Sequence, residues 1–418
     1  MDFLNIPSKF CEDLAQKIIG EKCTVMNCTL EPLGDFKCGF MGEHSILKIS
    51  IKESDQVLRF FLKSEPRVAM MREFADATRL FFKEHSFYHK IIPEFKKCNI
   101  QEMEDVVPTS YKYEKPNILF LEDLSLKNYT IFDSRQSLVS GFVNSALSTF
   151  AKFHASSLIY EEIRSKAIGK QYRLIDDYKN ELKESFYGHT IYNVRSVDST
   201  TKGIITQIDL FPEIEIENRD EFKSFVVNIW KNVNEFAKPS LKYRNVICQA
   251  DPWITNLMFK SGDEIKSKLI DYQMIRYAPP AQDVISFLYL CTTREFRKTH
   301  LKSSLEYYYA ELKKILEKYE IDENIVSETD FWDSVKYYEP FGMVQNLNHS
   351  HMTKLSPSAV KKLFENPFAL QKFIFEDKSE SLVKLCDENV RYKEKQKEFG
   401  DWTLLEWGVS ISVNYKVI

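Results

Sequence analysis

The sequence has little glycine and proline, no long apolar stretch and no excess of basic charge. Only 12 of its 418 residues are Gly and 14 are Pro, so it is not an assembly of domains on flexible linkers. No stretch approaches the roughly 18 consecutive apolar residues that span a bilayer, and we expect no membrane association. Lys and Arg number 57 against 61 Asp and Glu, a net charge of −4. This balance argues against a nucleic-acid partner, because phosphate contacts require a basic excess.

The cysteines give no sign of a metal site or of export. None of the eight forms a Cys-x-x-Cys pair, which argues against bound zinc. Four lie within the first forty residues, yet residues 1–5 lack the basic and then apolar pattern of a signal peptide. We therefore expect reduced thiols and a cytoplasmic protein.

Aromatic residues are abundant, and the chain is long enough for a sizeable core. They make up 14% of the sequence, with 31 Phe and 21 Tyr. Either a generous core or an apolar ligand cavity would account for them, and composition does not decide between the two. The length fits two or three domains, or one unit of two lobes.

The first 125 or so residues alternate between strand and helix patterns. Short strands are predicted at 25–26, 45–51, 57–62 and 118–121, with a polar hairpin turn at 52–56. Between them, the spacing of apolar residues predicts a helix over 67–91 that ends before Pro93. The pattern is typical of a small sheet with a helix packed on it.

After Asp123 the periodicity becomes mainly helical. Helices are predicted at 138–158, 175–187, 219–237, 281–298, 301–319, 329–346, 357–365 and 377–395. One strand pair interrupts them, 256–260 and 268–272, joined by the turn 261–264. We therefore predict an α+β fold of two lobes with a hinge near 122–126. Residues 1–124 form the nucleotide-binding lobe and 125–418 the catalytic and acceptor-binding lobe in this interpretation.

Three polar residues around the predicted strand pair have the spacing used in phosphoryl transfer. Asp251 is followed five positions later by Asn256, and Asp271 ends the second strand. In this chemistry the first Asp receives or orients the proton of a substrate hydroxyl, while the Asn and the second Asp hold Mg²⁺. The alternative is that Asp251 and Asn256 are ordinary turn residues and Asp271 a surface strand end.

The first lobe offers a second set of candidates. Lys63 ends an apolar strand, and Glu84 lies on the following helix. A strand lysine paired with a helix glutamate positions nucleotide phosphates in kinases, although most Lys and Glu side chains are simply solvated. Glu122 and Leu124 lie where the strand 118–121 enters the hinge, and the backbone there could pair with adenine.

These segments together resemble the ecdysteroid kinase-like (CHK kinase-like) family, relatives of the aminoglycoside and choline kinases with a protein-kinase-like fold. The resemblance is carried by 60–66, 82–88, 121–124, 147–157, the catalytic and metal segments, and 276–284. It implies that Asp251 is the catalytic residue and that Asn256 and Asp271 are Mg²⁺ ligands. It also implies that Lys63 contacts phosphate with Glu84 as its partner, and that ATP is the phosphoryl donor.

Two further residues receive roles from the resemblance. Asp283 is implied to brace the catalytic loop by accepting backbone hydrogen bonds, and as an acidic residue near a helix start it also suits the helix dipole. We expect His154 to be a core or loop-contacting histidine at a helix end, not a metal ligand or catalytic group.

The sequence departs from the family pattern at two places. The family has His-Gly before the catalytic Asp, whereas this chain has Gln249 and Ala250. Gln can donate a hydrogen bond in place of His, but Ala tolerates a positive φ poorly if that position requires one. The phosphate-covering loop, 34–40, keeps its glycines and an aromatic residue but lacks a clear Ser near its tip.

The resemblance implies an ATP- and Mg²⁺-dependent kinase that phosphorylates a hydroxyl of a lipophilic small molecule, either an ecdysteroid or another hydroxylated compound such as a dietary toxin. One alternative is a choline- or aminoglycoside-like kinase, which would need an acidic acceptor pocket. Another is a catalytically impaired pseudokinase that binds nucleotide or ligand, suggested by Gln249 and Ala250. We expect a monomer.

Overall fold

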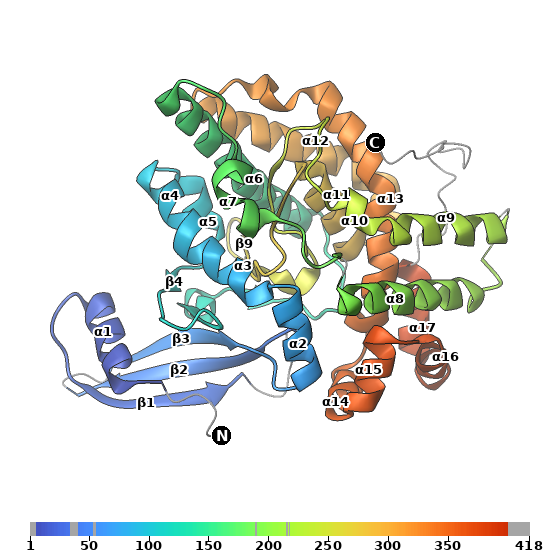
Figure 1. The fold of residues 1–418 in the computed structure, drawn as a ribbon, viewed down its shortest axis with the longest axis horizontal. Helices are drawn as coiled ribbons and strands as arrows, with labels where there is room; N and C mark the ends of the chain where they lie inside the picture. The colour runs from blue at the N-terminus through green and yellow to red at the C-terminus, as the bar shows by residue number, and fades with distance from the viewer. Residues whose placement is uncertain are drawn as a thin grey trace.

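The computed structural model describes residues 6–33, 41–52, 56–188, 190–214, 216 and 218–399. Figure 1 shows a small antiparallel sheet with helix α1 (Ser8–Ile19) at one end of the molecule and a larger, mainly helical part beside it. The predicted α+β arrangement of two lobes is confirmed. The boundary at residue 124 stays a prediction. The predicted turn at 52–56 and the loop at 34–40 lie wholly or mostly outside the described residues.

The small lobe is built on a five-stranded antiparallel sheet in the order β1-β2-β3-β5-β4. Its strands are β1 (Val25–Pro32), β2 (Glu43–Ile51), β3 (Val57–Ser64), β4 (Ser110–Tyr111) and β5 (Ile118–Glu122). Side chains alternate along β3, so that Phe60 and Leu62 join the core shared with α1 while Phe61 and Lys63 line a cavity. Because of this alternation, the side chain of Lys63, near the end of an apolar strand, points towards the cavity.

The single helix predicted over 67–91 is wrong, because the chain breaks within it and continues beyond it. The segments are α2 (Ala69–Ala77), α3 (Leu80–Ser86), a π-helical turn (Phe87–Ile91) and α4 (Ile92–Lys97). Arg79 has a φ of 59°, and this left-handed residue separates α2 from α3. Pro93 does not end the helical path because it lies in the first turn of α4, where its missing N–H costs nothing.

The large lobe is mainly helical, and its core surrounds α6 and α11. Its helices are α5 (Gln101–Val106), α6 (Ser140–Ile168), α7 (Leu174–Leu182), α8 (Ile191–Asp209), α9 (Arg219–Lys231), α10 (Val233–Phe236), α11 (Pro280–Cys291), α12 (Arg294–Lys318), α13 (Glu328–Thr353), α14 (Pro357–Glu365), α15 (Pro367–Phe375), α16 (Ser379–Glu388) and α17 (Val390–Phe399). Every residue of α11 is buried. Helices occur in all the predicted regions, but α5, α8 and α15 were not predicted.

The predicted helix 281–298 proves to be the whole of α11 and the start of α12. The two are separated because the Thr293 side chain accepts a hydrogen bond from the Phe296 N–H at 3.1 Å, which caps a new helix. The predicted helices 219–237 and 377–395 are likewise each divided in two.

Two strand pairs carry the central segment of the large lobe. They are β7 (Val246–Cys248) with β10 (Arg276–Ala278), and β8 (Leu257–Lys260) with β9 (Lys266–Leu269), to which β6 (Thr130–Ile131) adds a third strand. The β8–β9 hairpin was predicted, but its second strand was placed too late, at 268–272, because β9 begins at Lys266 and ends at Leu269, before Asp271. Asn256 therefore precedes β8 in a 3-10 turn, and Asp271 follows the end of β9.

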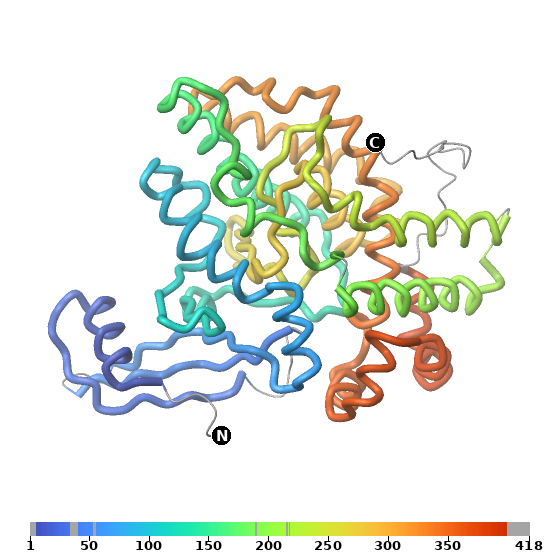
Figure 2. Tube along the Cα trace, in the orientation of Figure 1, coloured from blue at the N-terminus to red at the C-terminus, as the bar shows by residue number. Residues whose placement is uncertain are grey.

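The C-terminal helices return to the small lobe. In Figure 2 the orange-red end of the chain lies beside α2, which is blue. Met71 of α2 shares a buried cluster with Leu370 and Phe373 of α15, and the rings of Phe74 and Phe375 lie 5.2 Å apart. This packing places α15 against α2. None of the described helices combines the length and the apolar character needed to cross a membrane.

Candidate active site

Lys63 and Glu84 come together between β3 and α3. Lys63 Nζ donates to Glu84 Oε2 at 2.6 Å, and both side chains are almost fully buried. Glu84 Oε1 also accepts the backbone N–H of Tyr272 at 3.0 Å, which ties α3 to the chain after β9. The ion pair has the strand-and-helix arrangement that orients nucleotide phosphates in kinases.

Asp271 is the second carboxylate on Lys63. Its Oδ1 lies 2.8 Å from Lys63 Nζ, and its φ of 63° turns the chain sharply after β9. Burial opposes the charge of Lys63, but Asp271 and Glu84 outweigh it and raise the pKa of the ammonium group. Burial also raises the pKa of Glu84, against the pull of Lys63. One ammonium group is thus shared between two carboxylates, so a phosphate entering here would meet a lysine that is held in place and protonated.

Asp251 and Asn256 are joined within the loop that follows β7. Asn256 Nδ2 donates to the Asp251 backbone oxygen at 2.9 Å and to Asp251 Oδ2 at 3.0 Å. Burial, and after it the negative charge of Asp271, raises the pKa of Asp251 to about 7. A carboxyl group with a pKa near neutrality is suited to receive a proton from an alcohol.

Gln249 connects the two halves of this loop system. Its Oε1 accepts the backbone N–H of Asp251 at 2.8 Å, and its Nε2 donates to the carbonyls of Ile270 at 3.1 Å and Asp271 at 2.8 Å. The donor function considered for Gln in place of the family's His is therefore present. Ala250 has a φ of 70°, so the position does require the left-handed conformation and Ala adopts it under strain.

Asp283, at the start of α11, holds the same loop by its backbone. Its carboxylate accepts the backbone N–H groups of Gln249 at 2.6 Å and Ala250 at 2.9 Å. His154 Nε2 lies 3.2 Å from the same carboxylate, and its Nδ1 lies 2.7 Å from the Tyr308 hydroxyl. His154 is fully buried and contacts the loop through Asp283, as expected, but it lies in the middle of α6 and not at a helix end.

A buried arginine, which sequence reasoning missed, adds a further support. Arg276 Nε lies 3.0 Å from Glu184 Oε2, and one terminal nitrogen of Arg276 donates to the Ala250 carbonyl at 3.3 Å. Both sides of the strained Ala250 peptide unit are thus held by hydrogen bonds. Sequence reasoning missed Arg276 because its partners, Glu184 and Ala250, are distant from it in the sequence and come close only in the folded chain.

A cavity of about 330 Å³ lies between the sheet and the β8–β9 hairpin. Six of the seven predicted site residues line it: Lys63, Glu84, Glu122, Leu124, Asn256 and Asp271. The backbone N–H of Glu122 donates to Thr109 at 2.8 Å and is not available to a base. Leu124 opens a 3-10 helix, so its N–H has no carbonyl within the helix to bond. Pairing of adenine with this hinge stays a prediction.

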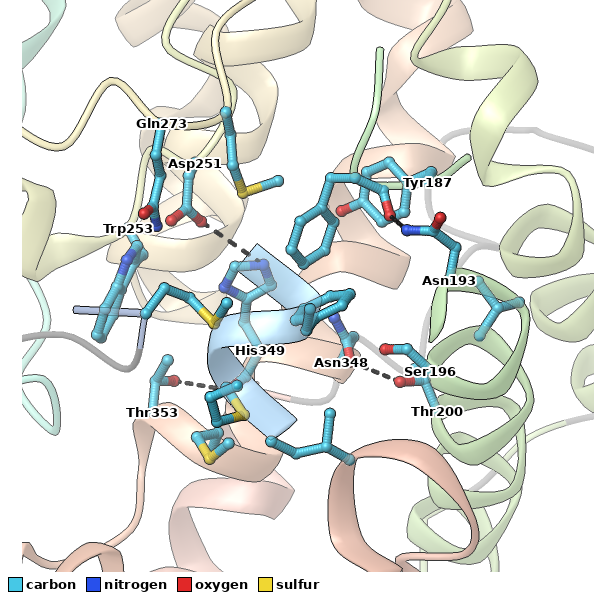
Figure 3. Close-up of a pocket in the computed structure, with 18 of the residues that line it drawn as sticks. Tyr187, Asn193, Ser196, Thr200, Asp251, Trp253, Gln273, Asn348, His349 and Thr353 are labelled. Carbon is cyan, nitrogen blue, oxygen red and sulfur yellow. Dashed lines mark hydrogen bonds and ion pairs between the residues drawn. The ribbon is translucent and has the colours of Figure 1, made fainter. Parts of the chain in front are cut away.

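Asp251, the seventh predicted residue, lines a second cavity of about 170 Å³, drawn in Figure 3. Ten of its lining residues are aromatic or methionine side chains: Met41, Met71, Phe74, Phe186, Tyr187, Trp230, Trp253, Met274, Met352 and Phe373. The others include the polar residues Asn193, Ser196, Thr200, Gln273, Asn348 and Thr353. Of the residues that the structure describes, Asp271 alone lines both cavities, so the two meet at this carboxylate.

His349 of α13 projects between Asp251 and the rest of the second cavity in Figure 3. Its Nε2 lies 3.9 Å from Asp251 Oδ1. Burial, together with the positive charges of Lys378 and Lys354, lowers the pKa of His349 to about 4, so the imidazole is neutral at pH 7. No sequence motif marks this residue.

The model of the ecdysteroid kinase-like family matches residues 40–321, about two thirds of the chain. The chain belongs to this family. The matched region contains all seven predicted site residues, whereas His349 and the C-terminal helices that complete the second cavity lie beyond it. Family membership and the strand lysine paired with a helix glutamate agree with the predicted protein-kinase-like fold.

Solved structures of small-molecule kinases are similar to this family member at low identity. An ethanolamine kinase of Plasmodium vivax is 10% identical with a TM-score of 0.41, over 88% of this chain and 83% of its own. A putative aminoglycoside phosphotransferase of Ralstonia eutropha is 12% identical with a TM-score of 0.41, over 94% and 99%. An aminoglycoside phosphotransferase of Streptomyces rimosus, in complex with ADP and streptomycin, is 12% identical with a TM-score of 0.33, over 75% and 92%. Scores this low do not by themselves establish a common fold. No curated protein matches the chain.

Proposed function

We propose that the protein is an ATP-dependent kinase that transfers the γ-phosphoryl group to a hydroxyl of a lipophilic small molecule, an ecdysteroid or another hydroxylated compound. The observation that carries the proposal is the meeting of two cavities at Asp271. One contains the Lys63–Glu84 ion pair, and the other is mainly apolar and contains Asp251. A phosphoryl donor in the first cavity and an alcohol in the second would face each other at this point.

The residues at the junction suit Mg²⁺. Asn256 directs its amide nitrogen to Asp251, which leaves Oδ1 as its free ligand atom, and Asp271 uses only one oxygen on Lys63. Hard oxygen ligands of this kind are those that Mg²⁺ prefers, and Asn256 and Asp271 would hold it. When bound, the ion would neutralise negative charge on the phosphates.

The chain's own groups then have separate tasks. Lys63, fixed by Glu84, would bind the nucleotide phosphates, and Asp251 would orient the acceptor hydroxyl and take its proton. Gln249 and Asp283 keep the Asp251 loop in place through its backbone N–H groups. Because Gln249 and Ala250 form a braced loop with the catalytic carboxylate in place, the geometry favours an active kinase over an impaired binder.

The second cavity favours an uncharged or anionic acceptor over a cation. Among the described residues that line it, the carboxylates are Asp251 and Asp271, and both have a part in the proposed transfer. An aminoglycoside-like polycation would need additional acidic partners, and any cationic acceptor would share the cavity with Lys378. Aromatic and methionine walls instead suit a lipophilic compound. The monomeric state and the cytoplasmic location stay predictions.

Nucleotide binding tests the first half of the proposal. Mg·ATP should raise the melting temperature of the full chain, because a ligand that binds only the folded state stabilises it by mass action. Asp271→Ala should remove most of the increase. Asp263→Ala, an exposed acidic residue in the turn of the same hairpin, is the matched control and should keep it. If wild type shows no shift with Mg·ATP, the proposal of a nucleotide-dependent kinase fails.

A further inference from the structure

A lysine lies in the wall of the mainly apolar second cavity. Lys378 directly precedes α16, and its side chain lines the cavity that also contains Asp251. Only 6% of the residue is exposed. A buried ammonium group is costly unless a partner compensates the loss of water, so its surroundings should reveal what partner it has.

The partners of Lys378 within the protein are weak. Its Nζ donates to Thr200 Oγ1 at 3.3 Å and lies 5.1 Å from the centre of the Phe373 ring. Within the part of the chain that the structure describes, no carboxylate forms an ion pair with it. Burial alone accordingly lowers the pKa of Lys378 to about 7. Of the three N–H groups of an ammonium, the protein thus engages one by a long hydrogen bond to a neutral hydroxyl.

The helix opposite Lys378 leaves room for it. A Cβ atom at Gly203 of α8 would lie 2.7 Å from Lys378 Cδ and 2.8 Å from Lys378 Cγ. Any other residue at 203 would therefore displace the lysine stem. Glycine inside a helix costs roughly 1 kcal/mol relative to alanine, so its presence here fits a requirement for the lysine at this place.

Thr200, the hydrogen-bond partner of Lys378, belongs to a small polar group on the cavity wall. Thr200 Oγ1 donates to Asn348 Oδ1 at 3.0 Å, and Ser196 lies one turn before Thr200 on α8. Figure 3 shows these three side chains on the far side of His349 from Asp251. The cavity therefore has an acidic end at Asp251 and a basic end at Lys378 and Thr200, with His349 between Asp251 and Thr200.

We propose that Lys378, with Thr200, binds a hydrogen-bond-accepting oxygen of the acceptor molecule, a carboxylate or a carbonyl, at the end opposite the hydroxyl that meets Asp251. The substrate class is then a lipophilic alcohol with an oxygen function at its far end. An acceptor with an ammonium group there would bring two cations together without a counter-charge. This inference rests on the proposed function for the direction of the acceptor, but the oxygen site itself can be tested by binding alone.

Matched probes separate the possibilities. We would titrate the full chain, without nucleotide, with ω-hydroxy alkyl compounds of graded length whose far end is a carboxylate, a methyl ester, a hydroxyl or an ammonium group. Trp230 and Trp253 line the cavity, so their fluorescence reports binding. At the best length, the carboxylate and the ester should bind about tenfold or more tighter than the ammonium compound, as expected for hydrogen bonds from a charged donor. If the carboxylate probe binds more tightly than the ester, the acceptor is an anion. If the two probes bind with equal affinity, the site recognises a carbonyl group.

Lys378→Met removes the charge while keeping most of the side-chain volume. It should abolish the preference for the oxygen-bearing probes and leave binding of the diol within about threefold. Lys372→Met is the matched control. It removes the same charge from the neighbouring helix α15, but Lys372 lies at the surface, where its ammonium group is 2.6 Å from Glu380. Gly203→Ala should weaken the preference while leaving the lysine in the sequence. Lys378→Met should also melt no lower than wild type, since it removes a buried cation without a carboxylate partner.

Several results would overturn the inference. It fails if wild type binds the four probes equally or prefers the ammonium compound, or if Lys378→Met keeps the preference. It also fails if Lys378→Met strongly destabilises the fold, which would show that the lysine has a structural partner. If wild type shows the preference and Lys378→Met loses it, the oxygen site is supported. If no phosphoryl transfer is then detected, the proposed function is refuted while the oxygen site is retained.

Discussion

Asp251→Asn should make the folded protein more stable while removing its proposed activity. Asp251 is held in a buried loop close to Asp271, and these surroundings raise its pKa from an ordinary value of 3.8 to about 7. At neutral pH the folded chain must therefore keep a carboxylate in a place that favours the protonated acid. Asn is neutral and of similar shape, and it can still accept the hydrogen bond from Asn256 Nδ2.

The magnitude follows from linkage between protonation and folding. A folded-state pKa above the unfolded value means that stability is highest below about pH 4 and is lost as the pH rises towards about 7. The full rise is worth roughly 4 kcal/mol at 1.36 kcal/mol for each pKa unit. Asp251→Asn should thus be more stable than wild type by up to about 4 kcal/mol at pH 7.5, and by less than about 2 kcal/mol at pH 5.

Thermal melting of the nucleotide-free chain in EDTA, between pH 5 and pH 8, measures this difference. The melting temperature of Asp251→Asn should exceed that of wild type, and the gap should widen as the pH rises. Asp263→Asn, at an exposed position of the hairpin turn, should show no such trend. An Asp251→Asn variant that melts lower than wild type at every pH, or a gap independent of pH, would refute the account of the buried carboxylate.

Three other substitutions test the parts that hold the site. Gln249→Ala leaves the Asp251 N–H and two carbonyls without their partner, so we expect a loss of about 1–3 kcal/mol in stability and a lower transfer rate. Gln249→His should be more stable and faster than Gln249→Ala. Ala250→Gly relieves a φ of 70° and should raise stability by up to about 1 kcal/mol in thermal or urea unfolding; a loss would contradict the strain. Lys63→Met leaves Glu84 and Asp271 buried without their cation and should cost about 3–5 kcal/mol and abolish the Mg·ATP shift, whereas unchanged melting would show that the ion pair is not needed.

The sequence predicted the site best where a reaction needs particular residue types at a particular spacing. The predicted residues Lys63, Glu84, Asn256 and Asp271 do share one cavity, because the strand period directs Lys63 to that side and the hairpin holds the last two. The helix over 67–91 was wrong because a single left-handed residue, Arg79, interrupts an otherwise continuous apolar pattern. Propensity alone does not reveal such a break.

The acceptor side was beyond reach of the sequence. His349 lies on α13 and Lys378 directly precedes α16, both outside the region that matches the family. Neither belongs to a motif, and only tertiary packing brings them into the cavity that contains Asp251. The aromatic excess has a clearer place. Phe74, Phe186 and other rings line the second cavity, while many more, such as Phe95 and Phe150, are fully buried in the core. Composition could not divide these two groups, because core and cavity walls use the same side chains.

The most direct test of the central claim is phosphoryl transfer itself. Purified full chain would be incubated with Mg·ATP and a panel of hydroxylated lipophilic compounds that includes 20-hydroxyecdysone, and phosphorylated products would be measured by mass spectrometry. We predict transfer to at least one acceptor by wild type and a rate lower by about 10² to 10⁴ in Asp251→Asn, the range expected for loss of a general base. The account is contradicted if Asp251→Asn transfers phosphate as fast as wild type, or if wild type is inactive and Gln249→His with Ala250→Gly creates the activity.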